Sequence, residues 1–258
     1  MEGGEGVTPL DRHERIALSV SGGKDSLAVA YLLRDEAHRI TAYHLNTGDL
    51  LPEVEEIVDH VRGMYPRFVT VRTDSNAWIA QHGLPSDLIP HSAHTVARWM
   101  GEEHTVLVPR YDCCAANLMA PLYERMKADG ISLVIRGTKR ADMNRLPNTS
   151  GDVQDGLELW LPIQTWTHEA VFDYLREVGA PICRVYEHVT NAPECARCSA
   201  WWGEKRASYL QQYHPELYDA YRARMRLVVR ELHRPMAHLA DEIAAMGGLR
   251  GLMEAANG

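Results

Sequence analysis

A run of six small or polar residues, SGGKDS at positions 21–26, separates two apolar segments near the start of the chain. The first segment, RIALSVS at 15–21, has the branched residues of a buried strand, and the second has apolar residues at helical spacing. A tight glycine turn between a strand and a helix leaves the first backbone N–H groups of the helix free, at the positive end of the helix dipole. Such a turn predicts an anion-binding loop.

Three kinds of phosphate-binding loop compete for this turn. A Walker A loop requires glycine, four residues and then Gly-Lys-Ser/Thr, but Leu18 and Asp25 stand where its first glycine and its Ser/Thr belong. The Gly-x-Gly-x-x-Gly dinucleotide fingerprint does not occur at this turn. The remaining pattern, directly after a strand, resembles the PP-loop of the ATP pyrophosphatase superfamily. The structural alternative is a plain glycine turn, with Ser21 or Asp25 capping the helix.

The residue types of the turn suit a polyphosphate ligand. Gly22 and Gly23 allow the backbone to approach the ligand, and neighbouring N–H groups can form a nest around a pyrophosphate. Lys24 can offset negative charge on the leaving oxygens. Asp25 can cap the helix or help to hold Mg²⁺. The candidate hydroxyl donors are Ser19, Ser21 and Ser26.

The cysteines form a second pattern with chemical potential. Cys113 and Cys114 are adjacent, and Cys195 and Cys198 form a Cys-x-x-Cys pair further along the chain. Adjacent side chains at a helix start diverge by about 100°, which makes convergence on one tetrahedral ion awkward. A cubane offers each thiolate its own iron, so the pattern favours a 4Fe–4S cluster. Structural zinc and unconnected buried thiols remain the alternatives.

Cys183 has no evident partner among the other cysteines. Free cysteine is among the most buried residue types, so we expect a packed core thiol. It is also the only cysteine left over for redox chemistry.

Strand-like and helix-like segments alternate along most of the chain, which predicts a mostly parallel sheet flanked by helices, an α/β fold of the PP-loop, Rossmann-like kind. In such sheets ligands sit outside the carboxyl ends of the strands, where the glycine turn falls. The expected strands lie within 15–21, 40–46, 67–73, 105–109, 131–138 and 157–163, and the expected helices within 24–34, 53–62, 115–127 and 168–177.

The character of the sequence changes near Pro193, where a cysteine-bearing segment precedes helices that we expect to break near Pro235. We predict an N-terminal tail at 1–14 and a PP-loop nucleotide-binding domain at 15–193. A Cys-x-x-Cys segment with a helical extension follows at 194–258.

The composition is that of an ordinary globular protein. The chain has 258 residues, 45% of them hydrophobic and 24% charged, with a formal net charge of −8. Because the net charge is negative, the composition does not indicate a protein that binds polyanions such as nucleic acids through its overall charge. The N-terminus has no signal pattern and no apolar run approaches membrane length, so we expect a cytoplasmic protein without membrane contact. Five cysteines in such a chain point to metal or redox chemistry before disulfides.

Taken together, the motifs resemble the phosphoadenosine phosphosulfate/adenosine phosphosulfate (PAPS/APS) reductase family, in its cluster-bearing branch, from about residue 16 to 202. NTGDLLPE at 46–53 resembles the family segment after the second strand, with Asn46 in place of the usual aspartate. RGTKRAD at 136–142 resembles a basic loop, and LPIQTWTHEAVFDYL at 161–175 resembles a later family segment. The paired cysteines match the cluster-bearing APS reductases.

The resemblance implies roles for individual residues. Asn46, Thr47 and Gly48, followed by Asp49, would lie near the adenosine. Lys139 and Arg140 would meet phosphate or sulfate. The cluster ligands would be Cys113, Cys114, Cys195 and Cys198.

Two departures from the family pattern bear on the reaction. The reductases use a cysteine in a C-terminal Glu-Cys-Gly motif, and no cysteine follows Cys198 here. Their PP-loops tend to be degenerate, whereas this loop keeps the form of enzymes that split ATP into AMP and pyrophosphate. We therefore expect an ATP-dependent adenylating enzyme with a 4Fe–4S cluster, acting in sulfur transfer or sulfur metabolism. One alternative is a thioredoxin-dependent APS/PAPS reductase releasing sulfite, and another is a non-catalytic nucleotide-binding subunit.

The expected ligands and partners follow from these hypotheses. They are ATP or an adenosine phosphosulfate nucleotide, with Mg²⁺, and a cysteine desulfurase or a thioredoxin-like thiol donor. A nucleic-acid target has weaker support, because cluster-bearing relatives with the ATP loop include DNA and tRNA sulfurtransferases. Arginines at helical spacing could bind its phosphates, or could form an ordinary solvated face. These arginines are Arg222, Arg226, Arg230 and Arg234.

Overall fold

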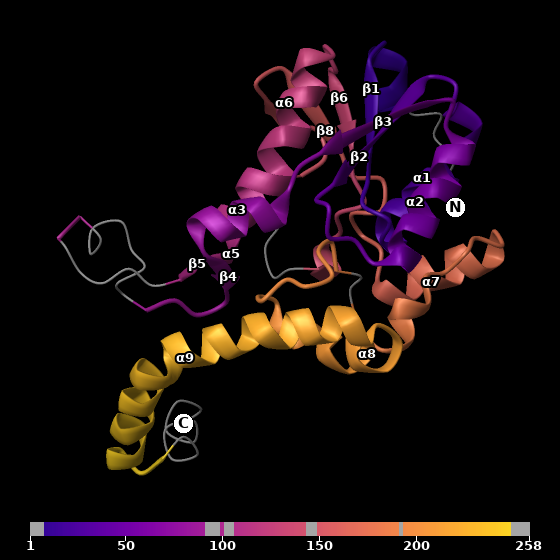
Figure 1. Ribbon diagram of the computed structural model, residues 1–258. Helices are drawn as coiled ribbons and strands as arrows, with labels where there is room; N and C mark the ends of the chain where they lie inside the picture. The colour runs from indigo at the N-terminus through magenta and orange to yellow at the C-terminus, as the bar shows by residue number, and fades with distance from the viewer. Residues whose placement is uncertain (1–7, 91–98, 101–105, 143–148, 191–192, 249–258) are drawn as a thin grey trace.

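The computed structural model describes residues 8–90, 99–100, 106–142, 149–190 and 193–248. Its centre is a six-stranded sheet in the order β3-β2-β1-β6-β8-β7 (Figure 1). All neighbouring strands pair in parallel except β7 and β8, which are antiparallel. The strands are β1 (Ile16–Val20), β2 (Ile40–Asn46), β3 (Arg67–Arg72), β6 (Leu133–Ile135), β7 (Val153–Gln154) and β8 (Leu157–Trp160). The predicted α/β sheet is confirmed.

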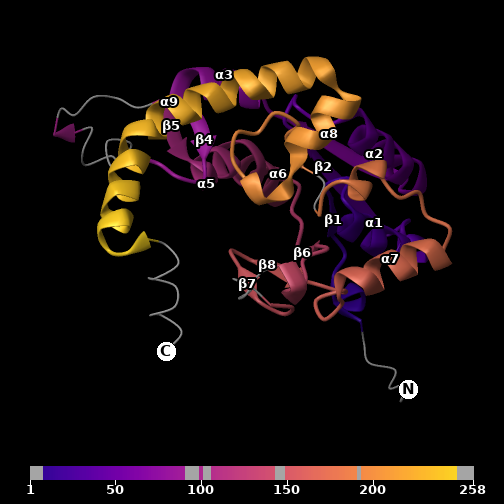
Figure 2. The ribbon, with the colours of Figure 1, turned by 90° about the horizontal axis from the view of Figure 1, so that it is seen from below.

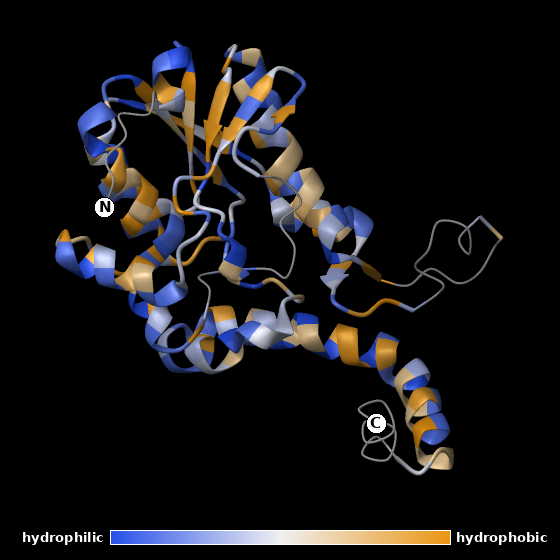
Figure 3. Cartoon of the chain, turned by 180° about the vertical axis from the view of Figure 1, so that it is seen from behind, coloured by the Kyte–Doolittle hydropathy of each residue, from blue (hydrophilic) through white to orange (hydrophobic). Residues whose placement is uncertain are grey.

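Helices cover both faces of this sheet (Figure 1). The helices α1 (Lys24–Leu32), α2 (Pro52–Met64) and α7 (His168–Glu177) pack on one face, and α6 (Ala120–Ala128) packs on the other. Alternation along β1 explains the two layers, because Ile16 and Leu18 enter the larger core and Ala17 enters the smaller one. The strands are accordingly apolar in the hydropathy view (Figure 3).

A second, smaller sheet pairs β4 (Leu84–Ser86) with β5 (Leu107–Pro109). The strand expected at 105–109 therefore exists, but it lies outside the main sheet. The helix α3 (Ser75–His82) precedes β4, and α5 (Arg110–Cys114) follows β5. The chain then continues through a π-helical turn, Ala115–Met119, into α6, so the helix expected to begin at 115 begins at Arg110 instead.

The C-terminal part of the chain lies across the carboxyl end of the sheet (Figures 1 and 2). It contains α8 (Arg206–Tyr213) and the long α9 (Pro215–Ala245). We expected a break near Pro235, but α9 continues through this residue. The helix is nevertheless bent along its length (Figures 1 and 2). A proline inside a helix removes one hydrogen bond and clashes with the preceding turn, which produces a kink. Among the described residues, no helix combines the length and hydropathy required to span a membrane.

Candidate functional site

The SGGKDS turn adopts the tight geometry that its glycines predict. Gly22 has a φ of +82°, and a Cβ at this position would lie 2.7 Å from Val54 Cγ1 and 2.9 Å from the Val54 carbonyl oxygen. The loop is held by its own hydroxyls. The Ser26 hydroxyl donates to the Gly23 carbonyl at 3.0 Å, and the Ser21 hydroxyl accepts from the Gly23 N–H at 3.3 Å. Ser21 and Ser26 therefore shape the loop directly.

The first turn of α1 has the unsatisfied amides that an anion site requires. The backbone N–H groups of Asp25 and Ser26 have no hydrogen-bond partner in the described part of the chain. Gly137 lies against this turn, and a Cβ at that position would be 2.6 Å from the Asp25 carbonyl carbon and 2.8 Å from the Ser26 nitrogen. Any side chain at residue 137 would therefore clash with the backbone of this turn. The neighbouring Lys24 N–H donates to the Tyr186 hydroxyl at 2.7 Å.

Buried charges extend from the turn into the basic loop after β6. Lys24 Nζ lies 3.0 Å from Asp25 Oδ2, and Lys139 Nζ lies 2.9 Å from Asp25 Oδ1. Lys139 also pairs with Asp142. Both lysines are almost completely buried. The structure thus places Lys24, Asp25 and Lys139 together, with Asp142 as a further member, and we call these four residues the lysine–aspartate chain.

Arg140 lies apart from this chain. Its side chain is exposed, and its backbone N–H donates to the Gln164 carbonyl at 2.9 Å. Ser19, on β1, has a buried hydroxyl oxygen without a hydrogen-bond partner among the described residues. These two residues were predicted as ligand contacts; in the structure the Arg140 side chain is exposed and the Ser19 hydroxyl is buried.

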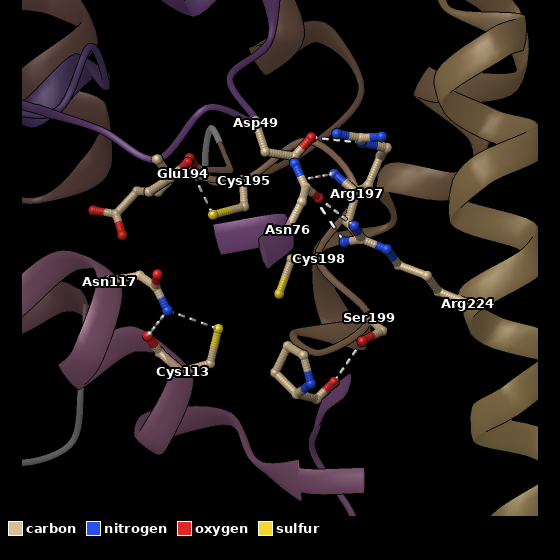
Figure 4. Close-up of polar contacts among 12 residues, drawn as sticks. Asp49, Asn76, Cys113, Asn117, Glu194, Cys195, Arg197, Cys198, Ser199 and Arg224 are labelled. Carbon is tan, nitrogen blue, oxygen red and sulfur yellow. Dashed lines mark hydrogen bonds and ion pairs between the residues drawn. The ribbon is translucent and has the colours of Figure 1, made fainter. Parts of the chain in front are cut away.

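The segment after β2 touches the cysteine-bearing segment directly. Asn46 Oδ1 accepts from the Gly48 N–H at 2.8 Å, which stabilises a turn with Gly48 at a φ of +75°. The Thr47 hydroxyl lies 3.4 Å from Cys195 Sγ, from which it accepts a hydrogen bond. Asp49 accepts from the Arg197 side chain at 2.6 Å (Figure 4). The expected adenosine segment and the Cys-x-x-Cys segment therefore form one structural unit.

A second layer of contacts fixes Arg197 and its segment to the helices. Arg224, on α9, donates to the Arg197 carbonyl at 2.7 Å and to Asn76 Oδ1 at 2.5 Å. Asp87 accepts from the backbone N–H groups of Trp201 and Trp202, both at 2.9 Å. These bonds anchor the cysteine-bearing segment from both sides.

The paired cysteines meet across two segments that are distant in the sequence. Figure 4 shows the sulfur atoms of Cys113, Cys195 and Cys198 directed toward one shared space. Cys198 interacts electrostatically with Cys113, with Cys114 and with Cys195. All of these cysteines are free thiols. The described residues contain no group of three or more His, Cys, Asp or Glu side chains arranged to hold a single metal ion.

The surroundings of these thiols favour their protonated forms. Burial, followed by the charge of Cys198, raises the pKa of Cys113 to about 11 and that of Cys114 to about 12. Burial likewise raises the pKa of Cys195. Asn117 donates to the Cys113 carbonyl at 3.0 Å and lies 3.7 Å from its sulfur. Such a thiol-rich, water-poor site is suited to a cation that replaces the protons.

Cys183 has a different environment. It is 5% exposed and belongs to the main hydrophobic core, as expected for a packed thiol. Burial raises its pKa. It also lines a small cavity with Gly22, Lys24 and Tyr186, which places it beside the PP-loop.

Several residues of the site were not singled out from the sequence. Gly137 and Asp142 lie within the recognised RGTKRAD segment, where the glycine was the available signal for close backbone approach. Tyr186 and Arg224 come from segments far from any motif, and no local pattern indicates their contacts with the site.

Comparisons with known proteins agree with this architecture. A model of the phosphoadenosine phosphosulfate reductase domain matches residues 15–200, which include the PP-loop and all five cysteines. The adenosine 5'-phosphosulfate reductase of Burkholderia cepacia is 22% identical over 215 residues, covering 76% of this chain and 79% of that protein. The enzyme of the same name from Allochromatium vinosum is 22% identical over 205 residues, covering 74% and 75%.

Two solved structures also match, at lower sequence identity. Phosphoadenylyl-sulfate reductase from Candida auris, in a phosphate complex, has a TM-score of 0.45 at 14% identity, covering 67% of this chain and 77% of that one. The NH3-dependent NAD synthetase of Campylobacter jejuni has a TM-score of 0.42 at 15% identity, covering 83% and 85%. On the domain match over residues 15–200, this chain belongs to the phosphoadenosine phosphosulfate reductase family of PP-loop nucleotide-binding enzymes.

Proposed function

We propose that this protein is an ATP pyrophosphatase of the PP-loop kind, which adenylates its substrate as a step in sulfur transfer or sulfur metabolism. The observation that carries the proposal is the pair of unpartnered amides at Asp25 and Ser26, in the first turn of α1, against which Gly137 packs closely. Amides at the start of a helix provide a site for the β- and γ-phosphates of ATP. The SGGKDS turn at 21–26 also keeps every residue of the PP-loop pattern expected of enzymes that split ATP.

The proposed reaction is a displacement at the α-phosphorus of ATP. An oxygen of the substrate attacks this phosphorus, the bond between the α-phosphorus and the α,β-bridging oxygen breaks, and pyrophosphate leaves with the electron pair on that oxygen. Lys24 and Lys139, whose ammonium groups pair with Asp25, would supply the positive charge that stabilises the departing pyrophosphate. Asp25 holds both ammonium groups, and Mg²⁺ arriving with the nucleotide would compete for its carboxylate. Asn46, Thr47 and Gly48 would border the adenosine, and Arg140 would meet phosphate from the exposed side.

The paired cysteines fit a 4Fe–4S cluster. Three of the sulfur atoms face one space, and the Cys114 thiol interacts electrostatically with Cys198. A cubane requires each thiolate to reach only its own iron, so the four sulfur atoms need not converge on one point. When bound, the cluster would hold the Cys-x-x-Cys segment against the adenosine segment, and it can also supply an iron for sulfur binding. Structural zinc is the competing occupant.

A second candidate function is the reduction of APS or PAPS to sulfite, and the named activity of the two bacterial relatives favours it. That reaction requires a thiolate that attacks sulfur. Cys183 is buried in the core with a raised pKa, so a thioredoxin-like partner is the better source of the thiol. In the sulfur-transfer proposal the corresponding partner is a cysteine desulfurase.

A nucleic acid is a candidate acceptor. Arg222, Arg226, Arg230 and Arg234 are all exposed on α9, although Arg222 and Arg230 pair with Asp219 and Glu231. If these arginines bind phosphates, the affinity for nucleic acid falls steeply as salt increases. An affinity that is insensitive to salt would remove this acceptor from consideration.

One experiment separates the two reactions. Anaerobically purified protein is incubated either with ATP and Mg²⁺ or with APS or PAPS and a thioredoxin system, and pyrophosphate and sulfite are measured. The proposal expects pyrophosphate from ATP, no sulfite, and unchanged pyrophosphate release by Cys183→Ser. Sulfite without pyrophosphate would establish the second candidate instead. Iron and acid-labile sulfide analysis of the same preparation tests the cluster, and stoichiometric zinc without iron would reject it.

A further inference from the structure

The side chain of Lys24, in the first turn of α1, is only 1% exposed although it carries a positive charge. A buried ammonium group is stable only where nearby groups replace the water that it loses. One such group is the Asp25 carboxylate, whose Oδ2 lies 3.0 Å from Lys24 Nζ. The same carboxylate pairs with Lys139 through Oδ1, so its single charge is shared between two ammonium groups. Further contacts that stabilise the Lys24 ammonium group are therefore expected.

Two aromatic rings supply these contacts. Lys24 Nζ lies 5.2 Å from the ring centroid of Tyr186 and 5.9 Å from that of Phe172. The two rings meet edge to face, with 5.5 Å between their centroids and an angle of 80° between their planes. A cation within about 6 Å of a ring centroid is attracted by the electron-rich face of the ring, most strongly where water is excluded. We call Phe172 and Tyr186 the aromatic pair.

Different parts of the chain bring the aromatic pair to the PP-loop. Phe172 lies on α7, which packs beside α1 (Figure 2), and Tyr186 lies on the short 3-10 helix Arg184–Glu187. The Tyr186 hydroxyl also accepts from the Lys24 backbone N–H at 2.7 Å. Tyr186 therefore contacts Lys24 twice, once at its backbone and once at its ammonium group.

An aromatic environment suits a lysine whose charge is needed by a phosphate ligand. A second carboxylate at this place would neutralise the ammonium group and would repel the phosphates of a nucleotide. An aromatic ring attracts the cation through its quadrupole but carries no net charge, so the positive charge of Lys24 is retained. Charged groups that are already in place when the substrate binds require no reorganisation during the reaction.

We propose that Tyr186 and Phe172 are positioning residues, which hold the Lys24 ammonium group beside the phosphate site of the PP-loop. The inference rests on the proposed function for the reaction that Lys24 serves, whereas the contacts themselves do not depend on it. The ring of Phe172 is shared with Arg176, whose guanidinium carbon lies 5.8 Å from the ring centroid. Tyr186, which is closer to Lys24 and also binds its backbone, should therefore have the larger effect.

The first test measures the release of pyrophosphate from ATP and Mg²⁺ by the full-length protein. Tyr186→Leu removes the ring, so we expect kcat to fall about tenfold. KM should change little, because the amides of Asp25 and Ser26 still bind the phosphates. Tyr186→Phe keeps the ring and loses only the hydroxyl, so its kcat should stay well above that of Tyr186→Leu. Phe172→Leu should lower kcat about threefold.

Phe68→Leu is the matched control. Phe68 and Phe172 are the two phenylalanines of the chain, and both are half-buried with a cation over the ring. For Phe68, on β3, this cation is Arg62, at 4.8 Å from the ring centroid. Phe68→Leu should leave kcat at the wild-type value. Equal kcat values for Tyr186→Phe and Tyr186→Leu would overturn the proposal, as would a rise in KM without a fall in kcat.

Chemical labelling of lysines distinguishes failure of this inference from failure of the proposed function. An amine-reactive ester is applied to the protein without nucleotide, and mass spectrometry compares the labelled fraction of Lys24 with that of Lys127, which is exposed. Lys24 should be protected in the wild type and in Phe68→Leu, and its labelling should rise severalfold in Tyr186→Leu. This pattern without any pyrophosphate release would reject the proposed reaction and uphold the placement of Lys24. Equal labelling of Lys24 in all three proteins would overturn the placement.

Discussion

Arg197 Nε lies 2.6 Å from Asp49 Oδ1, and this ion pair joins the segment after β2 to the segment that carries Cys195 and Cys198. The Asp49 side chain is 2% exposed, and it also lies 3.8 Å from Arg224 of α9. The Ala196 N–H donates to the Asp49 backbone carbonyl at 2.6 Å. One buried carboxylate therefore links the expected adenosine segment, the cysteine-bearing segment and the long C-terminal helix.

Asp49→Asn should loosen this link while preserving the size of the side chain. Hydrogen bonds to charged groups contribute about 2 kcal/mol, so we expect the free energy of unfolding to fall by about that amount. The matched control is Asp59→Asn, which removes an exposed carboxylate paired with Arg62 and should cost under about 0.5 kcal/mol. Chemical denaturation measures both. If the two variants had the same free energy of unfolding, the Asp49 carboxylate would not stabilise the contact between the segment after β2 and the cysteine-bearing segment.

Lys139→Met should disrupt the lysine–aspartate chain. It leaves the carboxylates of Asp25 and Asp142 without their shared, fully buried ammonium group. Removing one partner of a buried pair is costly, and because both aspartates are partly exposed we expect a loss of about 2 kcal/mol in stability. Pyrophosphate release should also fall, since Asp25 is no longer held in position. Unchanged stability would contradict the observed pairing.

Arg140→Met is the control for Lys139→Met, because it removes an adjacent positive charge that is exposed. Its free energy of unfolding should stay within about 0.5 kcal/mol of the wild type. If Arg140 contacts phosphate, the KM for the nucleotide should rise while kcat changes little. Comparing the two variants distinguishes Lys139, which we expect to position the loop, from Arg140, which we expect only to bind the nucleotide.

Local sequence patterns were sufficient for much of the fold. The turn between β1 and α1 combines a branched apolar strand, two glycines and an apolar helix, and all three signals agree. The helix predicted at 168–177 has these bounds in the structure, because Thr167 provides an N-cap whose side chain accepts from the Ala170 N–H. The strands that were missed, β4 and β7, have three and two residues and are too short for a periodic pattern.

Contacts between distant segments set the limit on what the sequence could predict for the site. The residue types of Lys139 and Arg140 indicated anion binding equally, yet Lys139 is buried and Arg140 exposed. Asp142, three residues after Lys139, is close enough to pair with it, but Asp25 comes from a different strand end. Asp49 and Arg197 are 148 residues apart. The pairing of β1 with β6 brings Asp25 to Lys139, and the packing of the cysteine-bearing segment on the sheet brings Arg197 to Asp49.

Glu53 should make the stability of the protein depend on acid. Burial would raise the pKa of this carboxyl group, but hydrogen bonds from Tyr209 and Arg184, together with His214, outweigh it and lower the pKa to about 2. In the unfolded chain the ordinary value is about 4.5. Because the folded pKa is depressed, the contribution is present above about pH 4.5 and is lost as the pH falls toward 2. It amounts to about 3 kcal/mol.

Denaturation of wild type and Glu53→Gln between pH 3 and pH 7 measures this contribution. The wild type should be more stable at pH 7, and the difference should shrink steadily below about pH 4.5. Glu56→Gln, on the exposed side of the same helix, should show no such convergence. A difference between wild type and Glu53→Gln that stays constant with pH would mean that the buried carboxylate is not stabilised by these partners.

Gly137→Ala should abolish nucleotide binding by displacing the first turn of α1, against which Gly137 packs. The new methyl group would lie 2.6 Å from the Asp25 carbonyl carbon and 2.8 Å from the Ser26 nitrogen, and backbone cannot yield as a flexible side chain can. Overpacking of this kind costs about 1 to 3 kcal/mol. We also expect ATP binding, measured by calorimetry, to be lost, because the strain displaces the amides that would hold the phosphates.

Gly63→Ala is the matched control for this substitution. Gly63 lies within α2, and a Cβ there would meet nothing within 4 Å. Since alanine loses less backbone entropy than glycine in a helix, this variant should gain about 0.5 kcal/mol or more and bind ATP as the wild type does. The free energy of unfolding should therefore fall for Gly137→Ala and rise for Gly63→Ala. This difference would show that the loss at residue 137 comes from its close contact with the α1 backbone and not from alanine itself. If Gly137→Ala bound ATP normally, the amides of Asp25 and Ser26 would not be the phosphate site.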